Sequence, residues 1–66
     1  MTPDEIKAAR LRLGMTQAAM AKALGYAHKQ SISDLERGVM KPSTAVKMLL
    51  EMMLEKADDR ERATPS

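Results

Sequence analysis

The sequence predicts a compact all-α domain of four helices, or at most five, and three observations support this class. Apolar residues recur at spacings of three and four along four segments, which is the pattern of a helix with one buried face. Thr2, Thr16 and Ser43 precede three of these segments and can cap their first turns. Glycines follow the first, second and third segments, where a helix commonly ends.

The first helix is expected over residues 3–13, because Pro3 suits the first helical position and Asp4 and Glu5 favour the positive end of the helix dipole. Its inward residues are Ile6, Ala9 and Leu13. The second helix is expected over 17–24, between the Thr16 cap and Gly25, and its inward residues are Met20, Ala21 and Leu24.

The third helix is expected to begin near His28 or Lys29 and to end at Arg37–Gly38, with Ile32 and Leu35 facing inward. The last helix is expected over 44–57. One face of that helix should close the core, and it carries Val46, Leu49, Leu50, Met53 and Ala57. Residues 58–66 are polar and are expected to form a flexible tail, which leaves residues 1–57 as the single domain.

Size and composition limit the possible functions. A chain of 66 residues supports one domain with a modest core, and without cysteine it has no disulfide to stabilise it, so self-association is an expected source of stability. No apolar run is long enough for a membrane span or a signal peptide, and we therefore expect a soluble, cytoplasmic protein.

The charge is unevenly distributed along the chain. Residues 1–50 contain eight Lys and Arg against four Asp and Glu, whereas residues 51–66 contain three against five. The predicted domain is thus basic, which suits phosphate binding, although many soluble proteins are equally basic. No nucleophile–base set or glycine-rich phosphate loop is present, and His28 lacks a second metal ligand at useful spacing. We expect no enzymatic activity, no metal and no cofactor.

The order of elements within residues 15–42 is a helix, a glycine turn and a second helix that is polar on its outer face. This is the layout of a helix-turn-helix, in which the second helix lies in the DNA major groove. The chain also resembles the phage repressor/Cro-type (XRE-like) helix-turn-helix family over about residues 4–50. The resemblance rests on Arg10, Thr16-Gln17, Ala21, Leu24-Gly25, Ile32, Leu35, Glu36-x-Gly38 and Lys41-Pro42-Ser43.

The resemblance implies a lambda-repressor-like fold, a DNA-binding activity and an ion pair between Arg10 and Glu36. The chain departs from the family pattern at the turn Tyr26-Ala27-His28, which is one residue longer than usual. The segment from Lys41 to Met53 resembles the end of compact repressors in which one long helix pairs the subunits. Some antitoxins are built this way, as are small phage autorepressors, including those beside anti-CRISPR genes.

The outer face of the third helix carries the residues expected to contact DNA bases: Lys29, Gln30, Ser33, Asp34 and Arg37. Gln can pair with adenine, and Arg or Lys with guanine. Asp34 would be repelled by phosphates, and it either accepts a bond from cytosine or orients a neighbouring Lys or Arg. The alternative for the whole face is a solvated surface without a ligand.

Phosphate contacts are expected from residues at the starts of helices and at the turn: Gln17, Tyr26, His28, Lys41, Ser43 and Thr44. Tyr26 has a second possible role, which is packing over the turn. The last helix carries more apolar surface than one small domain can cover, so we expect a dimer interface made by Ala45, Met48, Met52 and Glu55. The alternative is that Met48 and Met52 fold back on the core.

The sequence therefore predicts a homodimeric repressor that binds an inverted-repeat operator on double-stranded DNA, with autorepression as its simplest role and localisation to the nucleoid through DNA binding. One alternative is an antitoxin that represses its operon and also binds a toxin. Another is a protein-interaction module that no longer binds DNA. A neighbouring toxin gene would favour the former, and absence of any gel shift the latter.

Overall fold

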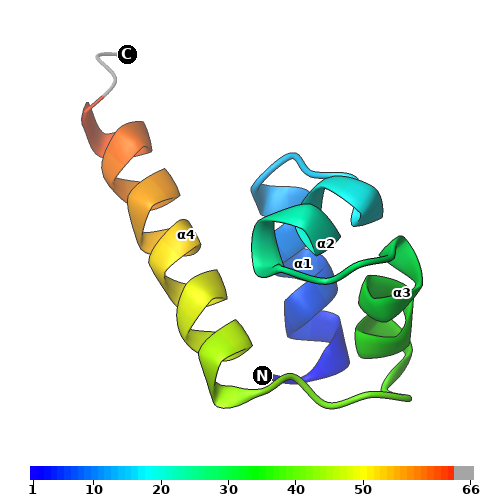
Figure 1. The fold of residues 1–66 in the computed structure, drawn as a ribbon. Helices are drawn as coiled ribbons and strands as arrows, with labels where there is room; N and C mark the ends of the chain where they lie inside the picture. Colours follow the sequence, from blue (N-terminus) through cyan, green and yellow to red (C-terminus); the bar gives the residue numbers. More distant parts are fainter. Residues whose placement is uncertain (64–66) are drawn as a thin grey trace.

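The computed structural model describes residues 1–63, and these residues form four helices without any strand (Figure 1). α1 spans Pro3–Arg12, α2 Gln17–Leu24, α3 Lys29–Arg37 and α4 Thr44–Ala63. In Figure 1, α1, α2 and α3 lie together, and α4 runs along one flank of this group. The predicted all-α class is confirmed, and the described part of the chain has four helices rather than five.

Side-chain caps fix the starts of α1, α2 and α4. At α1 the Thr2 hydroxyl accepts a bond from the Glu5 N–H at 3.2 Å, and the Glu5 carboxylate accepts one from the Thr2 N–H at 3.0 Å. The bond that the Thr2 backbone N–H donates to the carboxylate is the main cause that holds the pKa of Glu5 below its usual value. The Thr16 hydroxyl caps α2 through the N–H of Ala19, and the Ser43 hydroxyl accepts from the N–H of Val46. The three caps predicted from the sequence are confirmed.

Two glycines place α3 against the rest of the domain. Gly25 ends α2 with a φ of 84°, and the Tyr26 N–H beyond it donates to the Ala21 carbonyl at 2.8 Å. A side chain at this left-handed position would be strained. Gly38 ends α3 with a φ of 77°, and a Cβ there would lie 3.3 Å from Pro3 Cγ. Glycine at 38 therefore also lets the end of α3 approach the start of α1.

One apolar core joins all four helices. Its fully buried side chains are Ile6 from α1, Met20 from α2, Ile32 and Leu35 from α3, and Leu50 from α4. Ala9, Ala21, Leu24 and Val46 complete the buried cluster, and partly buried methionines surround it. α3 packs on both α1 and α2, so its inner face is fixed by two neighbours.

α4 differs from its prediction in two respects. Leu49 was expected in the core but is 40% exposed, because on a helical wheel it lies between the inward Leu50–Met53 face and the outward Met48–Met52 face. The expected helix end near Ala57 is also wrong, since α4 continues to Ala63. Asp58 in this extension forms an ion pair with Arg12 of α1, so its charge has a partner within the fold. The remaining residues of the predicted tail, 64–66, lie outside the described residues.

Candidate nucleic-acid interface

The outer face of α3 is polar along its whole length. Gln30 and Arg37 are exposed, Ser33 and Asp34 between them are half-buried, and Lys29 is exposed at the first helical position. These five residues are the ones that the sequence assigned to base contacts. The opposite face carries Ile32 and Leu35, which are fully buried. α3 therefore presents a polar stripe to solvent on a helix whose other side is anchored in the core.

Three side chains of this stripe are joined by hydrogen bonds. Asp34 Oδ1 accepts a bond from Gln30 Nε2 at 3.0 Å and another from Arg37 Nη2 at 2.7 Å. The bond from Arg37, followed by that from Gln30, holds the pKa of Asp34 below its usual value. Asp34 is thus a carboxylate that orients its neighbours, one of the two roles left open by the sequence. Arg37 was a candidate partner; the bond to Gln30 was not foreseen, although Gln and Asp four residues apart on a helix are a known pair.

The turn before α3 holds Tyr26 and His28. Tyr26 is half-buried and packs against the core cluster, while His28 is exposed at the N-cap of α3 and makes no side-chain capping bond. The start of α3 agrees with the prediction despite the longer turn, because Gly25 redirects the chain and Lys29 is the first helical residue. Both residues lie just before the N-terminus of α3, where a phosphate contact was expected.

The N-terminus of α2 offers backbone donors beside Gln17. The Thr16 hydroxyl accepts a hydrogen bond from the Ala19 N–H, and the Met20 N–H donates one to the Thr16 carbonyl. Within the described residues, the N–H groups of Gln17 and Ala18 have no acceptor. Donors at the positive end of a helix are suited to a phosphate oxygen.

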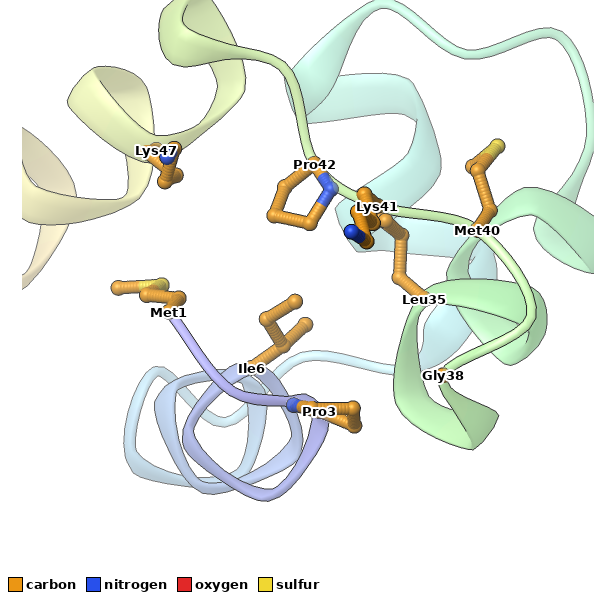
Figure 2. A pocket seen from close by; sticks show the side chains of 9 residues that line it. All are labelled: Met1, Pro3, Ile6, Leu35, Gly38, Met40, Lys41, Pro42 and Lys47. Atoms are coloured by element: carbon orange, nitrogen blue, oxygen red, sulfur yellow. The ribbon is translucent and has the colours of Figure 1, made fainter.

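The connection from α3 to α4 carries Lys41 and Ser43, and α4 begins at Thr44; all three residues are exposed. Figure 2 shows Lys41 and Lys47 on either side of Pro42, at a pocket of about 320 Å³ whose walls include Met1, Pro3, Ile6, Leu35, Gly38 and Met40. Among the side chains that the structure describes, those of residues 1–60, neither lysine has an ion-pair or hydrogen-bond partner. Their charges are therefore available to an anion outside the domain.

An ion pair ties the end of α3 to α1. Arg10 Nε and Nη2 donate to the two carboxylate oxygens of Glu36 at 2.7 and 3.2 Å, and Arg10 Nη1 donates to the Met15 carbonyl at 3.1 Å. The two side chains are only 14% and 7% exposed. The hydrogen bonds that Arg10 donates to the Glu36 carboxylate raise the pKa of Arg10 above its usual value. This is the pair that the resemblance implied; it fixes the C-terminal half of α3 against α1.

The outer face of α4 carries large exposed apolar side chains. Met48 and Met52 are 57% and 60% exposed, and Ala45 and Glu55 on the same side are exposed as well. The alternative in which these methionines fold back on the core is therefore wrong for this chain. Exposure of neighbouring large apolar side chains is a common mark of a protein contact.

α2 and α3 are joined at a left-handed glycine, and α3 carries a polar outer stripe, which is the arrangement of a helix-turn-helix. A family model described as helix-turn-helix matches residues 6–52, more than half of the chain. The chain belongs to this XRE-type helix-turn-helix family, whose members bind DNA.

No curated protein and no solved structure gives a significant match to this chain. None of the helices in the described residues combines the length and apolarity needed to cross a bilayer.

Proposed function

We propose that this protein is a homodimeric, sequence-specific repressor that binds an inverted-repeat operator in the promoter of its own gene. The observation that carries the proposal is the asymmetry of α3. Its inner face is held by Ile32, Leu35 and the Arg10–Glu36 pair, and its outer face is polar and open. A helix anchored in this way can enter the major groove without losing its place in the fold.

The proposed base contacts come from Lys29, Gln30, Ser33 and Arg37, with Asp34 on the same face. Gln supplies a donor and an acceptor that match adenine, and Arg and Lys match the two acceptors of guanine. The proposed phosphate contacts come from residues that flank α3 on both sides: Gln17, Tyr26, His28, Lys41, Ser43 and Thr44. Support for the latter set comes from the backbone N–H of Gln17 and the charge of Lys41, neither of which has a partner among the described residues.

The proposed dimer forms through the outer face of α4, with Met48 and Met52 at its centre and Ala45 and Glu55 beside them. A two-fold pair would present two α3 helices to successive major grooves, roughly 34 Å apart. Residues 1–57 would act as the DNA-binding and dimerisation unit. Bound over a promoter in the cytoplasm, such a dimer would exclude polymerase by occupancy alone.

Footprinting of the purified protein on the DNA upstream of its own gene tests the proposal. We expect protection of two half-sites separated by about one helical turn. Absence of any protection or gel shift at low salt, with a folded protein, would leave a protein-interaction module as the better explanation. Protection of a single half-site would remove the dimer and keep the DNA-binding role.

A further inference from the structure

The centre of the α3 outer face is one carboxylate oxygen that serves two donors. Asp34 Oδ1 lies 3.0 Å from Gln30 Nε2 and 2.7 Å from Arg37 Nη2. Gln30 lies one turn before Asp34, and Arg37 lies nearly one turn after it. The two side chains that are best equipped to read bases are therefore held by the same atom, from opposite directions along the helix.

These bonds leave the base-reading groups of both side chains available. A glutamine amide has two N–H donors and one carbonyl oxygen, so with one N–H on Asp34 it keeps the donor and acceptor that adenine requires. A guanidinium has five N–H donors, and Arg37 uses one of them on Asp34. Fixing both side chains before DNA arrives lowers the entropy that binding must remove.

The charge of Asp34 acts differently on specific and non-specific DNA. A carboxylate beside Arg37 weakens the attraction of that cation to phosphates, which are the same in every sequence. Hydrogen bonds to the correct base edges depend on the position of the side chain and are favoured by its fixed orientation. The same group thus penalises binding to the wrong DNA and supports binding to the right one.

We propose that Asp34 is a positioning residue for operator recognition: it couples Gln30 to Arg37 and raises sequence discrimination without itself contacting a base. This inference rests on the proposed DNA-binding function. It assigns to Asp34 a role in specificity, in place of the cytosine contact that the sequence had left open.

The test compares wild-type protein with D34A, which removes the acceptor, and D34N, which keeps an acceptor but removes the charge. Each protein selects duplexes from a randomised 20-base-pair pool, and its affinity is then measured for the wild-type consensus and for a scrambled duplex. E51Q is the matched control, because it makes the same charge change at an exposed residue of α4. Circular dichroism establishes that each variant is folded.

We expect D34A to lower the ratio of consensus to scrambled affinity by about tenfold or more, through weaker consensus binding and stronger scrambled binding. D34N should increase scrambled binding to the same extent but lose less discrimination, because it still accepts a hydrogen bond. Both variants should steepen the salt dependence by about one phosphate contact for each protomer. E51Q should keep the wild-type ratio and the wild-type consensus.

A folded D34A that keeps the wild-type ratio and enriches the same consensus would overturn the inference. A folded D34A that binds scrambled DNA more weakly than wild type would overturn it too, since Asp34 would then support DNA binding in general. If wild type itself enriches no sequence, the proposed function falls and the inference falls with it. Whether the wild-type protein enriches a sequence therefore distinguishes failure of the proposed DNA-binding function from failure of the role given to Asp34.

Discussion

The outer faces of α3 and α4 are both exposed, and their chemistry is opposite. On α3 the exposed side chains are polar, and three of them bond to one another through Asp34. On α4 the exposed large apolar side chains are Met48, Leu49 and Met52, which can neither donate nor accept a strong hydrogen bond. Both helices bury an apolar inner face in the same core, so the difference lies entirely in what each offers to solvent.

This contrast indicates two kinds of partner. A polar face with organised donors gains little from contact with apolar protein surface and much from base edges and phosphates. An apolar face gains most when another protein surface removes it from water. Under the proposed function, the two faces would allow the domain to bind DNA and a second copy of itself at the same time.

The largest expected effect concerns the polar side of the comparison. If the dimer neutralises about 6–10 phosphates, its affinity for operator DNA should fall roughly 10³–10⁵-fold between 50 and 200 mM salt. Fluorescence anisotropy with a labelled operator duplex measures this directly. A flat response over that range would mean that phosphates contribute little, and the assignment of Gln17 and Lys41 to the backbone would be lost.

The next largest effect concerns the ion pair that anchors α3 to α1. Replacing Glu36 with alanine leaves the largely covered Arg10 with only its bond to the Met15 carbonyl, and loss of one partner from such a pair costs about 3–5 kcal/mol of folding free energy. That loss is comparable to the whole stability of a small domain, so Glu36→Ala should unfold it. Chemical denaturation followed by circular dichroism gives the value, with Glu51→Ala at an exposed site of α4 as the control. A folded Glu36→Ala with altered operator choice would instead place Glu36 in DNA recognition.

The sequence predicted those features that depend on local signals. The bounds of α2, the start of α3 and the three caps follow from residues that are neighbours in the chain, such as Thr16 and Gly25. The Arg10–Glu36 pair, by contrast, spans 26 residues and came from family resemblance, because no spacing rule brings those positions together.

The features that were not predicted depend on tertiary contacts. The extension of α4 beyond Ala57 includes the pair of Arg12 with Asp58, which lie 46 residues apart in sequence. A run of charged residues looks the same in a tail and in a helix until such a partner is known. Likewise, helical periodicity put Leu49 at the edge of the core face, and only the packing of α4 decides that it is exposed.

The apolar side of the comparison is tested by charge insertion. Replacing Met48 or Met52 with glutamate would bury a carboxylate in the proposed interface and should raise the dimer dissociation constant about 100-fold or more. Sedimentation equilibrium measures this. Leu11→Glu is the matched control, because Leu11 is a 61% exposed apolar residue on α1 and lies outside the proposed interface. A tight dimer in both methionine variants and a dissociated one in Leu11→Glu would move the contact to α1.

The smallest expected effect concerns the titration of Asp34, which reports whether the polar face is organised in solution. The bond from Arg37 holds the pKa of Asp34 below that of free aspartate, about 3.9. Because the folded-state pKa is the lower one, the carboxylate favours folding above the unfolded value, and that contribution disappears as the pH falls through the folded pKa.

Carbon-detected NMR of the Asp34 carboxyl group should therefore give a midpoint below that of free aspartate. In Arg37→Gln the midpoint should rise towards the free value, and in Gln30→Ala it should rise less, because the bond from Arg37 is the main cause of the shift. A wild-type midpoint at the free value, unmoved by Arg37→Gln, would mean that the two side chains do not associate in solution. The exposed side chains of α3 would then lack hydrogen bonds to one another. The outer faces of α3 and α4 would differ only in the polarity of their side chains.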